Sequence, residues 1–260
     1  MDPQLIEQLG DELYAALRDR KVVEPLTNRH EGIGIEDAYQ IQQRMIARRL
    51  EAGERIVGKK IGVTSRAVMN MLGVYQPDFG YLLDGMVMNE GESIDTRTLI
   101  QPKAEGEIAF VLKRDLMGPG IGNADVLAAT ECVMPCFEIV DSRIRDWKIK
   151  IADTVADNAS CGVFVLGDSA VDPRRIDLVT CGMVLEKNGE IVATGAGAAA
   201  LGAPANAVAW LANTLGRLEI PLRAGEVILS GSLAAMVPVK AGDNLRVTIG
   251  GIGGCSVRFV

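Results

Sequence analysis

The spacing of apolar residues changes near Arg55, and this change limits the possible folds more than any other feature of the sequence. Upstream, apolar residues recur at helical intervals over residues 3–19 and again over residues 36–51. Downstream, short apolar runs are separated by segments rich in glycine, a pattern that is typical of β-strands. The sequence therefore predicts a small helical lobe over residues 1–54 and a β-rich core over residues 55–260.

The strand candidates of the second part follow one another with few helices between them. They are EGEIAFVLK, MPCFEIVDS, GVFVLG, CGMVLEKNGEIVATG, EVILSGSL and LRVTIGGIGGCSVRFV. Asn188-Gly189 separates two apolar runs and predicts a two-residue hairpin turn. Within this part, helices are expected for the short segment SRAVMNMLG and for residues 204–218, which begin with a proline. Many strands with few helices predict an α+β fold with a mixed sheet, not a doubly wound sheet.

The charge and hydropathy of the chain exclude several classes of protein. The formal charge is −7, whereas binding to nucleic-acid phosphates requires a basic stripe. No apolar run reaches the roughly 18 residues of a transmembrane helix, and the acidic N-terminal segment is unlike a signal peptide. We therefore expect a cytoplasmic protein that binds neither nucleic acid nor membrane. The five cysteines are scattered, without a second cysteine or histidine pair, which favours buried free thiols over a zinc site.

The chain contains one histidine, His30, and this limits the chemistry available to it. A metal site built from several histidines is impossible within one subunit, and Ser-His-Asp or Cys-His catalysis would depend on that single residue. A bound metal would then be held mainly by oxygen atoms. Oxygen ligands favour Mg²⁺ or Mn²⁺ over zinc or copper.

Three glutamates are the strongest candidates for such oxygen ligands. Glu105 and Glu107 open the strand EGEIAFVL, and residues two apart in a strand point to the same face. Glu138 interrupts the apolar run MPCFEIVDS, where a buried carboxylate needs a partner such as a metal. The alternatives are an exposed strand face for the first pair, and a salt bridge from Glu138 to Arg143 or Arg145.

Other polar residues could bind a substrate or move a proton. Of Lys59 and Lys60, one should face the core and could have a lowered pKa, although the side chains could also extend to solvent. Asp78 lies in the turn QPDFG and Asp157 in VADNASCG, where ordinary turn roles compete with catalytic ones. The Ser230–Ser232 segment follows a strand and could present backbone N–H groups to an anion.

Seven segments, taken in chain order, resemble the hydratase and decarboxylase branch of the fumarylacetoacetase superfamily. They are GKKIGVTSRAV, QPDFGYL, LIQPKAEGEIAFVL, PCFEIVDSRI, DTVADNASCGVFVLG, GAGAAALG and ILSGSL, and the likeness runs over essentially the whole chain. The resemblance implies the β-rich mixed-sheet core of the fumarylacetoacetase C-terminal type. It also implies that Glu105, Glu107 and Glu138 hold Mg²⁺ or Mn²⁺. The active-site lysine of the family falls on Lys60 and its loop aspartate on Asp78.

Within the branch the sequence is most similar to hydratases of aromatic meta-cleavage catabolism. This implies addition of water to 2-hydroxypenta-2,4-dienoate, giving 4-hydroxy-2-oxopentanoate, with the substrate carboxylate and C2 oxygen chelating the metal. Lys60 and Asp78 would form the proton-transfer and substrate-orienting pair, with acid and base not distinguished, and Ser160 would contact the substrate carboxylate. The family also implies a homo-oligomer and a possible complex with the decarboxylase of the pathway.

Three other functions compete with hydration. The sister enzymes decarboxylate 2-oxo-3-hexenedioate and need a pocket for a second carboxylate, whereas the apolar segments YQPDFGYLLDGM and MNMLGV suit an uncharged substrate end. Related C–C hydrolases activate water with a histidine–glutamate pair, for which the adjacent His30 and Glu31 are a poor match. A non-enzymatic partner of a decarboxylase is the third alternative, and the complete set of three glutamates with Lys60 argues against it.

Overall fold

The computed structural model describes residues 1–260 except for the side chains of Ala67, Met71 and Leu72, so part of the apolar segment MNMLGV lies outside the description. The helices are α1 (Pro3–Asp19), α2 (Leu26–Arg29), α3 (Ile35–Glu51), α4 (Arg66–Leu72), α5 (Asn123–Ala129), α6 (Ile151–Ala156) and α7 (Pro204–Gly216). The strands are β1 (Ile56–Gly62), β2 (Asp78–Leu83), β3 (Val87–Asn89), β4 (Ser93–Ile94), β5 (Pro102–Leu112), β6 (Thr130–Asp141), β7 (Cys161–Leu166), β8 (Gly182–Lys187), β9 (Glu190–Ala196), β10 (Val227–Leu229), β11 (Val237–Pro238), β12 (Asn244–Ile249) and β13 (Gly253–Phe259). Helices α1 and α3 and the β-rich remainder agree with the predicted fold class, while α5 and α6 were not expected.

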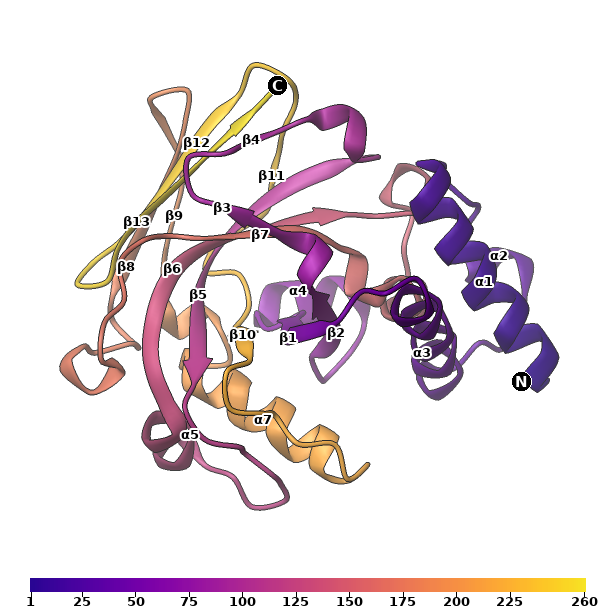
Figure 1. The fold of residues 1–260 in the computed structure, drawn as a ribbon, viewed down its shortest axis with the longest axis horizontal. Coiled ribbons are helices and arrows are strands. Elements are labelled where there is room, and N and C mark those ends of the chain that lie inside the picture. The colour runs from indigo at the N-terminus through magenta and orange to yellow at the C-terminus, as the bar shows by residue number, and fades with distance from the viewer.

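The N-terminal helices lie to one side of the sheets, as Figure 1 shows. Asp11 of α1 accepts hydrogen bonds from both Arg44 and Arg48 of α3, which joins the two helices on their polar side. Their apolar faces form one hydrophobic cluster with Ile144 and with residues of α6. The helical lobe therefore completes its core with residues from the second part of the chain. The division at residue 54 stays a prediction.

The larger sheet has eight strands and carries the candidate site. Seven of them follow the order β2-β1-β10-β5-β6-β7-β3, and β11 pairs with one end of β5. β1 and β10 are parallel, whereas β5 is antiparallel to both β10 and β6, so the sheet is mixed as predicted. The long strands β5 and β6 curve across the molecule in Figure 1. Their unbroken antiparallel pairing over most of this length fixes which side chains face one another at the site.

The second sheet has five strands in the order β4-β13-β12-β8-β9. Asn188 and Gly189 both have positive φ and connect β8 to β9, which confirms the hairpin expected at this position. The terminal run LRVTIGGIGGCSVRFV, read from the sequence as one strand candidate, is instead the antiparallel pair β12 and β13. The reversal between them includes Gly251 at φ 78°, a conformation that glycine adopts without the strain of a Cβ atom.

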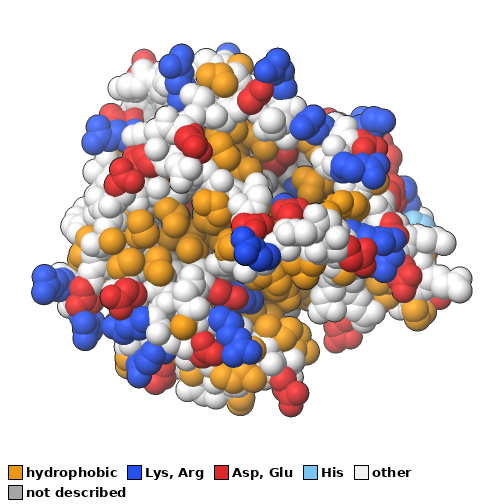
Figure 2. All heavy atoms as spheres, viewed as in Figure 1, with side chains coloured by type: hydrophobic (Ala, Val, Ile, Leu, Met, Phe, Trp, Pro, Cys, Tyr) orange, Lys and Arg blue, Asp and Glu red, His pale blue; other side chains and the backbone are white. Residues whose placement is uncertain are grey.

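The two sheets pack face to face on the side of β5 that points away from the candidate site. A Cβ atom on Gly106 would lie 3.0 Å from Val247 of β12, so this glycine permits the close approach of the layers. No helix in the described part of the chain is long and apolar enough to cross a membrane. Figure 2 shows Lys and Arg side chains interspersed with Asp and Glu over the face in view, without a basic stripe on that face.

Candidate active site

Three glutamates converge on one face of the larger sheet. Glu105 of β5 lies opposite Glu138 of β6, and Glu107 lies opposite Cys136, so the alternation of side chains puts all three carboxylates on the same side. One carboxylate oxygen from each lies within 4.8 Å of those of the other two. Glu107 and Glu138 are buried, whereas Glu105 is partly exposed. The three carboxylates therefore form a single enclosed site that is open to solvent on the Glu105 side.

Three of the four carboxylate oxygens of Glu107 and Glu138 have no hydrogen-bond donor within the described structure, although Glu138 forms an ion pair with Lys60. Among the described atoms, neither oxygen of Glu138 and only one oxygen of Glu107 has a hydrogen-bond partner. The donor to Glu107 is the backbone N–H of Gly231, at 2.8 Å. Unpaired buried carboxylates are costly, and a divalent cation is one of the few groups that can satisfy three of them together. The donor set consists of oxygen atoms alone and fits a hard divalent cation.

Burial and mutual repulsion shift the pKa values of Glu105 and Glu107 upward. Burial, together with the negative charge of Glu138, raises the pKa of Glu105 to about 7. Burial raises the pKa of Glu107 well above its ordinary range, and the charges of Glu138 and Glu105 add to the shift. In each case a second negative charge in the enclosed site is destabilised. Without a cation, Glu105 and Glu107 therefore retain protons that an exposed glutamate would lose.

Lys60 contributes the positive charge nearest to the trio. Its Nζ lies 3.1 Å from Oε1 of Glu138, and both side chains are almost fully buried. Burial acts to lower the pKa of Lys60, but the negative charges of Glu138 and Asp78 outweigh it, so the pKa is raised. The lowered pKa considered from the sequence is therefore not found at Lys60. It is found at Lys59, where burial lowers the pKa and the ammonium group binds Glu226 at 2.7 Å.

Asp78 is the first residue of β2, not a residue of a turn, and it lies opposite Gly62 of β1. A Cβ atom on Gly62 would stand 2.2 Å from Oδ1 of Asp78 and 3.3 Å from Nζ of Lys60, so the glycine leaves space where these two groups meet. Oδ1 of Asp78 has no hydrogen-bond partner within the described structure. Burial raises the pKa of Asp78, and Lys60 opposes this shift. Asp78 and Lys60 thus belong to the same buried charge cluster as Glu138.

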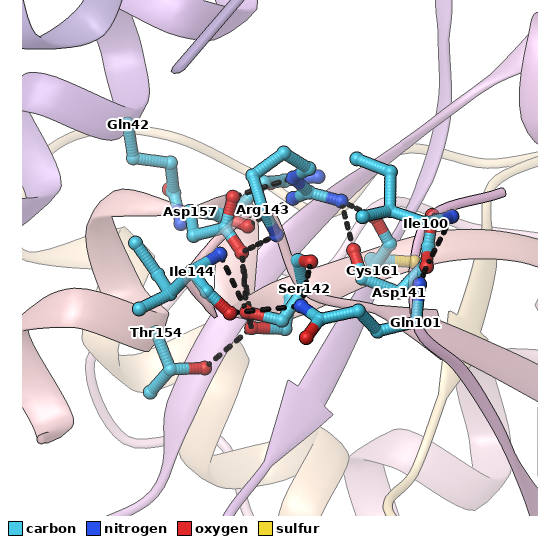
Figure 3. Close-up of polar contacts among 12 residues, drawn as sticks. Gln42, Ile100, Gln101, Asp141, Ser142, Arg143, Ile144, Thr154, Asp157 and Cys161 are labelled. Atoms are coloured by element: carbon cyan, nitrogen blue, oxygen red, sulfur yellow. Dashed lines mark hydrogen bonds and ion pairs between the residues drawn. The ribbon is translucent and has the colours of Figure 1, made fainter. Parts of the chain in front are cut away.

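Ser160 lies beside a second group of buried polar residues, of which Ser142, Thr154 and Asp157 are labelled in Figure 3. Its hydroxyl is 3.2 Å from Asp157, 3.2 Å from Thr154 and 3.4 Å from Ser142. Asp157 accepts hydrogen bonds from the side chain and the backbone N–H of Arg143. The hydroxyl of Ser160 is thus engaged with other protein groups, and its contact with a substrate carboxylate stays a prediction.

The buried pair of Arg143 and Asp157 was missed from the sequence, where Arg143 was an alternative partner for Glu138. Beyond this pair, Asn158 hydrogen-bonds to both the N–H and the C=O of Tyr81. The turn that follows α6 therefore connects the end of β6, which carries one glutamate of the trio, to β2, which carries the aspartate. The only signal in the sequence was the run of polar residues in VADNAS beside an apolar strand.

The remaining candidates have structural surroundings of their own. The N–H of Gly231 in the Ser230–Ser232 segment binds Glu107 and is not free for another anion. His30 follows α2 in the helical lobe, and the neighbouring Glu31 is exposed. All five cysteines are free thiols, and four of them are buried.

Comparison with known proteins gives a consistent group of relatives. Residues 74–260 match the family described as fumarylacetoacetate (FAA) hydrolase C-terminal. A 2-hydroxypent-2,4-dienoate hydratase of Pseudomonas putida is 71% identical over 221 residues, which cover 85% of this chain and 100% of the relative. A 2-hydroxyhexa-2,4-dienoate hydratase of Comamonas testosteroni is 57% identical, covering 99% of this chain and 98% of the relative.

A solved structure resembles the whole fold. It is the 4-oxalocrotonate decarboxylase from Pseudomonas putida G7, complexed with magnesium and adipate, with a TM-score of 0.97 and 39% identity. The match covers 100% of this chain and 99% of the decarboxylase. The helical lobe and both sheets are thus shared with an enzyme that binds a divalent cation and a dicarboxylic acid.

Proposed function

The chain belongs to the fumarylacetoacetate hydrolase family, and on this premise we propose that it is a metal-dependent hydratase of 2-hydroxypenta-2,4-dienoate. The product is 4-hydroxy-2-oxopentanoate, and the reaction is a step of aromatic meta-cleavage catabolism. The observation that carries the proposal is the glutamate trio beside Lys60, in a chain that is 71% identical over 221 residues to a hydratase named for this substrate.

Glu105, Glu107 and Glu138 hold Mg²⁺ or Mn²⁺ in this proposal. The buried oxygens of Glu107 and Glu138 that lack hydrogen-bond donors support the assignment, as does the magnesium in the 39% identical decarboxylase. When bound, the cation supplies Lewis-acid stabilisation of negative charge on the C2 oxygen of the substrate. The raised pKa values of Glu105 and Glu107 are consistent with carboxylates that ionise fully only when a cation is present.

Lys60 and Asp78 move protons and orient the substrate. Hydration requires a proton at C5 and loss of the C2 hydroxyl proton, which gives an unsaturated keto acid; water then adds its oxygen at C4 and a proton at C3. Both side chains are buried beside the trio, so protons can pass between them and a bound substrate without mixing with bulk water. Ser160 is assigned to the substrate carboxylate, for which its hydroxyl would exchange a contact to Ser142 or Thr154.

Identification of the product tests the proposed reaction. The protein is incubated with 2-hydroxypenta-2,4-dienoate and Mg²⁺ or Mn²⁺, and the products are identified by NMR. We expect 4-hydroxy-2-oxopentanoate, with turnover lost after EDTA treatment and restored by the metal. Unchanged substrate in the presence of either metal, or turnover that EDTA does not affect, would overturn the proposal.

Decarboxylation of 2-oxo-3-hexenedioate is the second candidate reaction. The TM-score of 0.97 to a 4-oxalocrotonate decarboxylase favours it, while identities of 71% and 57% to hydratases favour hydration. Both reactions use stabilisation of the same kind of enolate, so the site itself does not separate them. Release of CO₂ from 2-oxo-3-hexenedioate without hydration of the dienoate would reverse the order of the two candidates.

We also propose that the chain forms a homo-oligomer and that this oligomer associates with the decarboxylase of the same pathway. The edge strand β9 supports the first point, since Ile191 and Val192 project from it with 65% and 44% of their surface exposed. Exposed apolar residues on an edge strand are typical of contact surfaces. Light scattering of the purified chain, alone and with the decarboxylase, measures both associations; a monomer at micromolar concentration would contradict the first.

A further inference from the structure

The strand that begins with Asp78 lies at the edge of the larger sheet. β2 is the outermost strand there, and among the described strands it pairs with β1 alone. The outer edge of such a strand presents backbone N–H and C=O groups that no neighbouring strand satisfies. Every residue of β2 is buried, so these groups need partners within the protein.

Two amide side chains supply partners for the outer edge of β2. Asn158 accepts a hydrogen bond from the N–H of Tyr81 at 2.8 Å and donates one to its C=O at 2.9 Å. A residue of a neighbouring antiparallel strand would make the same two bonds. Gln42 of α3 is buried and donates to the C=O of Phe79 at 2.9 Å. Side chains from the turn after α6 and from the helical lobe thus take the place of a strand.

Asn158 also contacts the face of β2 that belongs to the site. Gly80 lies opposite Lys60 of β1, and a Cβ atom on Gly80 would stand 2.6 Å from the backbone oxygen of Asn158. Side chains alternate along a strand, so position 80 shares its face with Asp78. Asn158 therefore packs beside the proposed proton-transfer pair, in a contact so close that position 80 must be glycine.

The turn that carries Asn158 has a left-handed backbone. The three residues 158–160 have φ values of 53°, 48° and 53°, and none of them is glycine. This conformation is unfavourable for residues with a Cβ atom, and it persists where surrounding contacts impose it. Here the guanidinium of Arg143 donates to the carbonyl oxygens that flank the three residues, those of Asp157 and Cys161. The turn is therefore held at both ends, and the amide of Asn158 extends from a fixed position.

We propose that Asn158 is a positioning residue for the hydration reaction: its amide fixes the edge of β2 and thereby the place of Asp78 beside Lys60. The inference rests on the proposed hydratase function and adds to it a residue that acts through Asp78. A displacement of about 1 Å at a reacting group can lower a rate by about 100-fold, so a restraint on this strand bears directly on turnover. Gln42 gives a second restraint on the same edge, and through it the helical lobe contributes to catalysis.

Asn158→Ala tests this role, with Asn213→Ala as the matched control. Asn213 of α7 also binds the N–H and the C=O of one residue, Ile121, at 2.9 and 2.8 Å, on elements that carry none of the site residues. Both variants lose two hydrogen bonds and should unfold at a lower denaturant concentration than the wild type. With the dienoate and saturating Mn²⁺, only Asn158→Ala should lose at least about tenfold in kcat. Its KM and Mn²⁺ affinity should stay within about threefold of the wild type, because the glutamates keep their places.

Asn158→Gly separates loss of the amide from strain in the backbone, since glycine adopts the left-handed conformation readily. It should show the same loss of kcat as Asn158→Ala. Hydrogen–deuterium exchange of residues 78–83 adds a measurement that needs no substrate. Exchange in this strand should be faster than in the wild type for both Asn158 variants and unchanged for Asn213→Ala.

Three results would overturn the positioning role: a wild-type kcat in Asn158→Gly, an equal loss of kcat in Asn213→Ala, or a fall in Mn²⁺ affinity that accounts for the lost turnover. If neither Asn158 variant folds, Gln42→Met decides the question, because it removes the donor to Phe79 in a side chain of similar length. Its kcat should also fall at least about tenfold, and an unchanged value would reject the inference. Absence of turnover in the wild type would refute the proposed function, whereas unchanged exchange in β2 would refute the restraint on the strand itself.

Discussion

The buried pair of Arg143 and Asp157 offers a sharp test of how the fold supports the site. The two side chains are 1% and 0% exposed, and they lie at the centre of the contacts in Figure 3. Arg143 also donates to the carbonyl oxygens of Asp141 and Cys161, so its guanidinium is enclosed by protein. Asp157→Ala removes the carboxylate and leaves that positive charge without a counter-ion. We expect a large loss of stability from this one substitution.

The magnitude follows from the partners that are lost. Asp157 accepts hydrogen bonds from Nε and the backbone N–H of Arg143 and from the hydroxyl of Ser142. Breaking a buried ion pair by removing one partner costs about 3–5 kcal/mol, because an uncompensated charge stays buried. For a chain of this size that corresponds to a fall in Tm of about 6–20 °C. The double variant Arg143→Met/Asp157→Ala removes the charge as well and should recover part of the loss.

Denaturant unfolding at a fixed protein concentration measures the effect, with circular dichroism as the readout. Asp19→Ala is the matched control, since its carboxylate pairs with Arg18 at 2.8 Å on the exposed surface. The midpoint of this control should stay close to that of the wild type, because exposed pairs are screened by solvent. If Asp157→Ala unfolded at the same denaturant concentration as the control, the reasoning on the buried pair would be refuted.

Three further predictions concern the site itself. Affinity for Mn²⁺ should weaken as the pH drops below about 7, by up to tenfold per pH unit for each proton that the metal displaces. The reason is that the pKa of Glu105 is raised to about 7 and that of Glu107 is also raised well above its ordinary range. Calorimetry between pH 5.5 and 8 measures this affinity, and a constant value would contradict the prediction. In the metal-free protein, the raised pKa of Glu105 means that the folded state binds more protons than the unfolded state. The contribution of Glu105 to stability is therefore fully present below about pH 4.5 and is lost as the pH rises through about 7. Denaturation curves across this pH range, with and without EDTA, test whether stability falls in this direction. The variants Lys60→Met and Gly62→Ala should both retain Mn²⁺ and lower kcat, by at least about 100-fold for Lys60→Met. Gly62→Ala acts by displacing Asp78, whose Oδ1 would lie 2.2 Å from the new Cβ. Steady-state kinetics combined with Mn²⁺ titration separates these losses of kcat from loss of metal.

Much of the fold could be predicted because local patterns and tertiary packing agree. The helical spacing over residues 3–19 and 36–51 matches α1 and α3, and the Asn188-Gly189 signal matches the β8–β9 hairpin. The division of the terminal run LRVTIGGIGGCSVRFV into β12 and β13 was harder to predict. Its apolar residues continue across the turn, which only the glycines mark. The helices α5 and α6 were missed because each is shorter than two full turns. So short a segment shows little helical periodicity in its apolar residues.

The site could be predicted only in part. The Glu-x-Glu spacing indicates a shared face for Glu105 and Glu107, but their register with Glu138 depends on strand pairing, which one sequence does not reveal. The family resemblance named these residues, and the structure brings their carboxylates together. No local pattern could indicate that Gly231 donates to Glu107, since this contact joins positions far apart in the chain.

Binding of Mn²⁺ tests the central claim most directly, because every step of the account depends on three carboxylates holding one divalent cation. The free ion is counted by electron paramagnetic resonance during titration of the wild type and of Glu105→Gln, Glu107→Gln and Glu138→Gln, with Glu131→Gln as an exposed control. We predict one Mn²⁺ per chain in the wild type and the control, and a loss of affinity of at least about tenfold in each of the three variants. Equal binding by Glu138→Gln and the wild type would contradict the account.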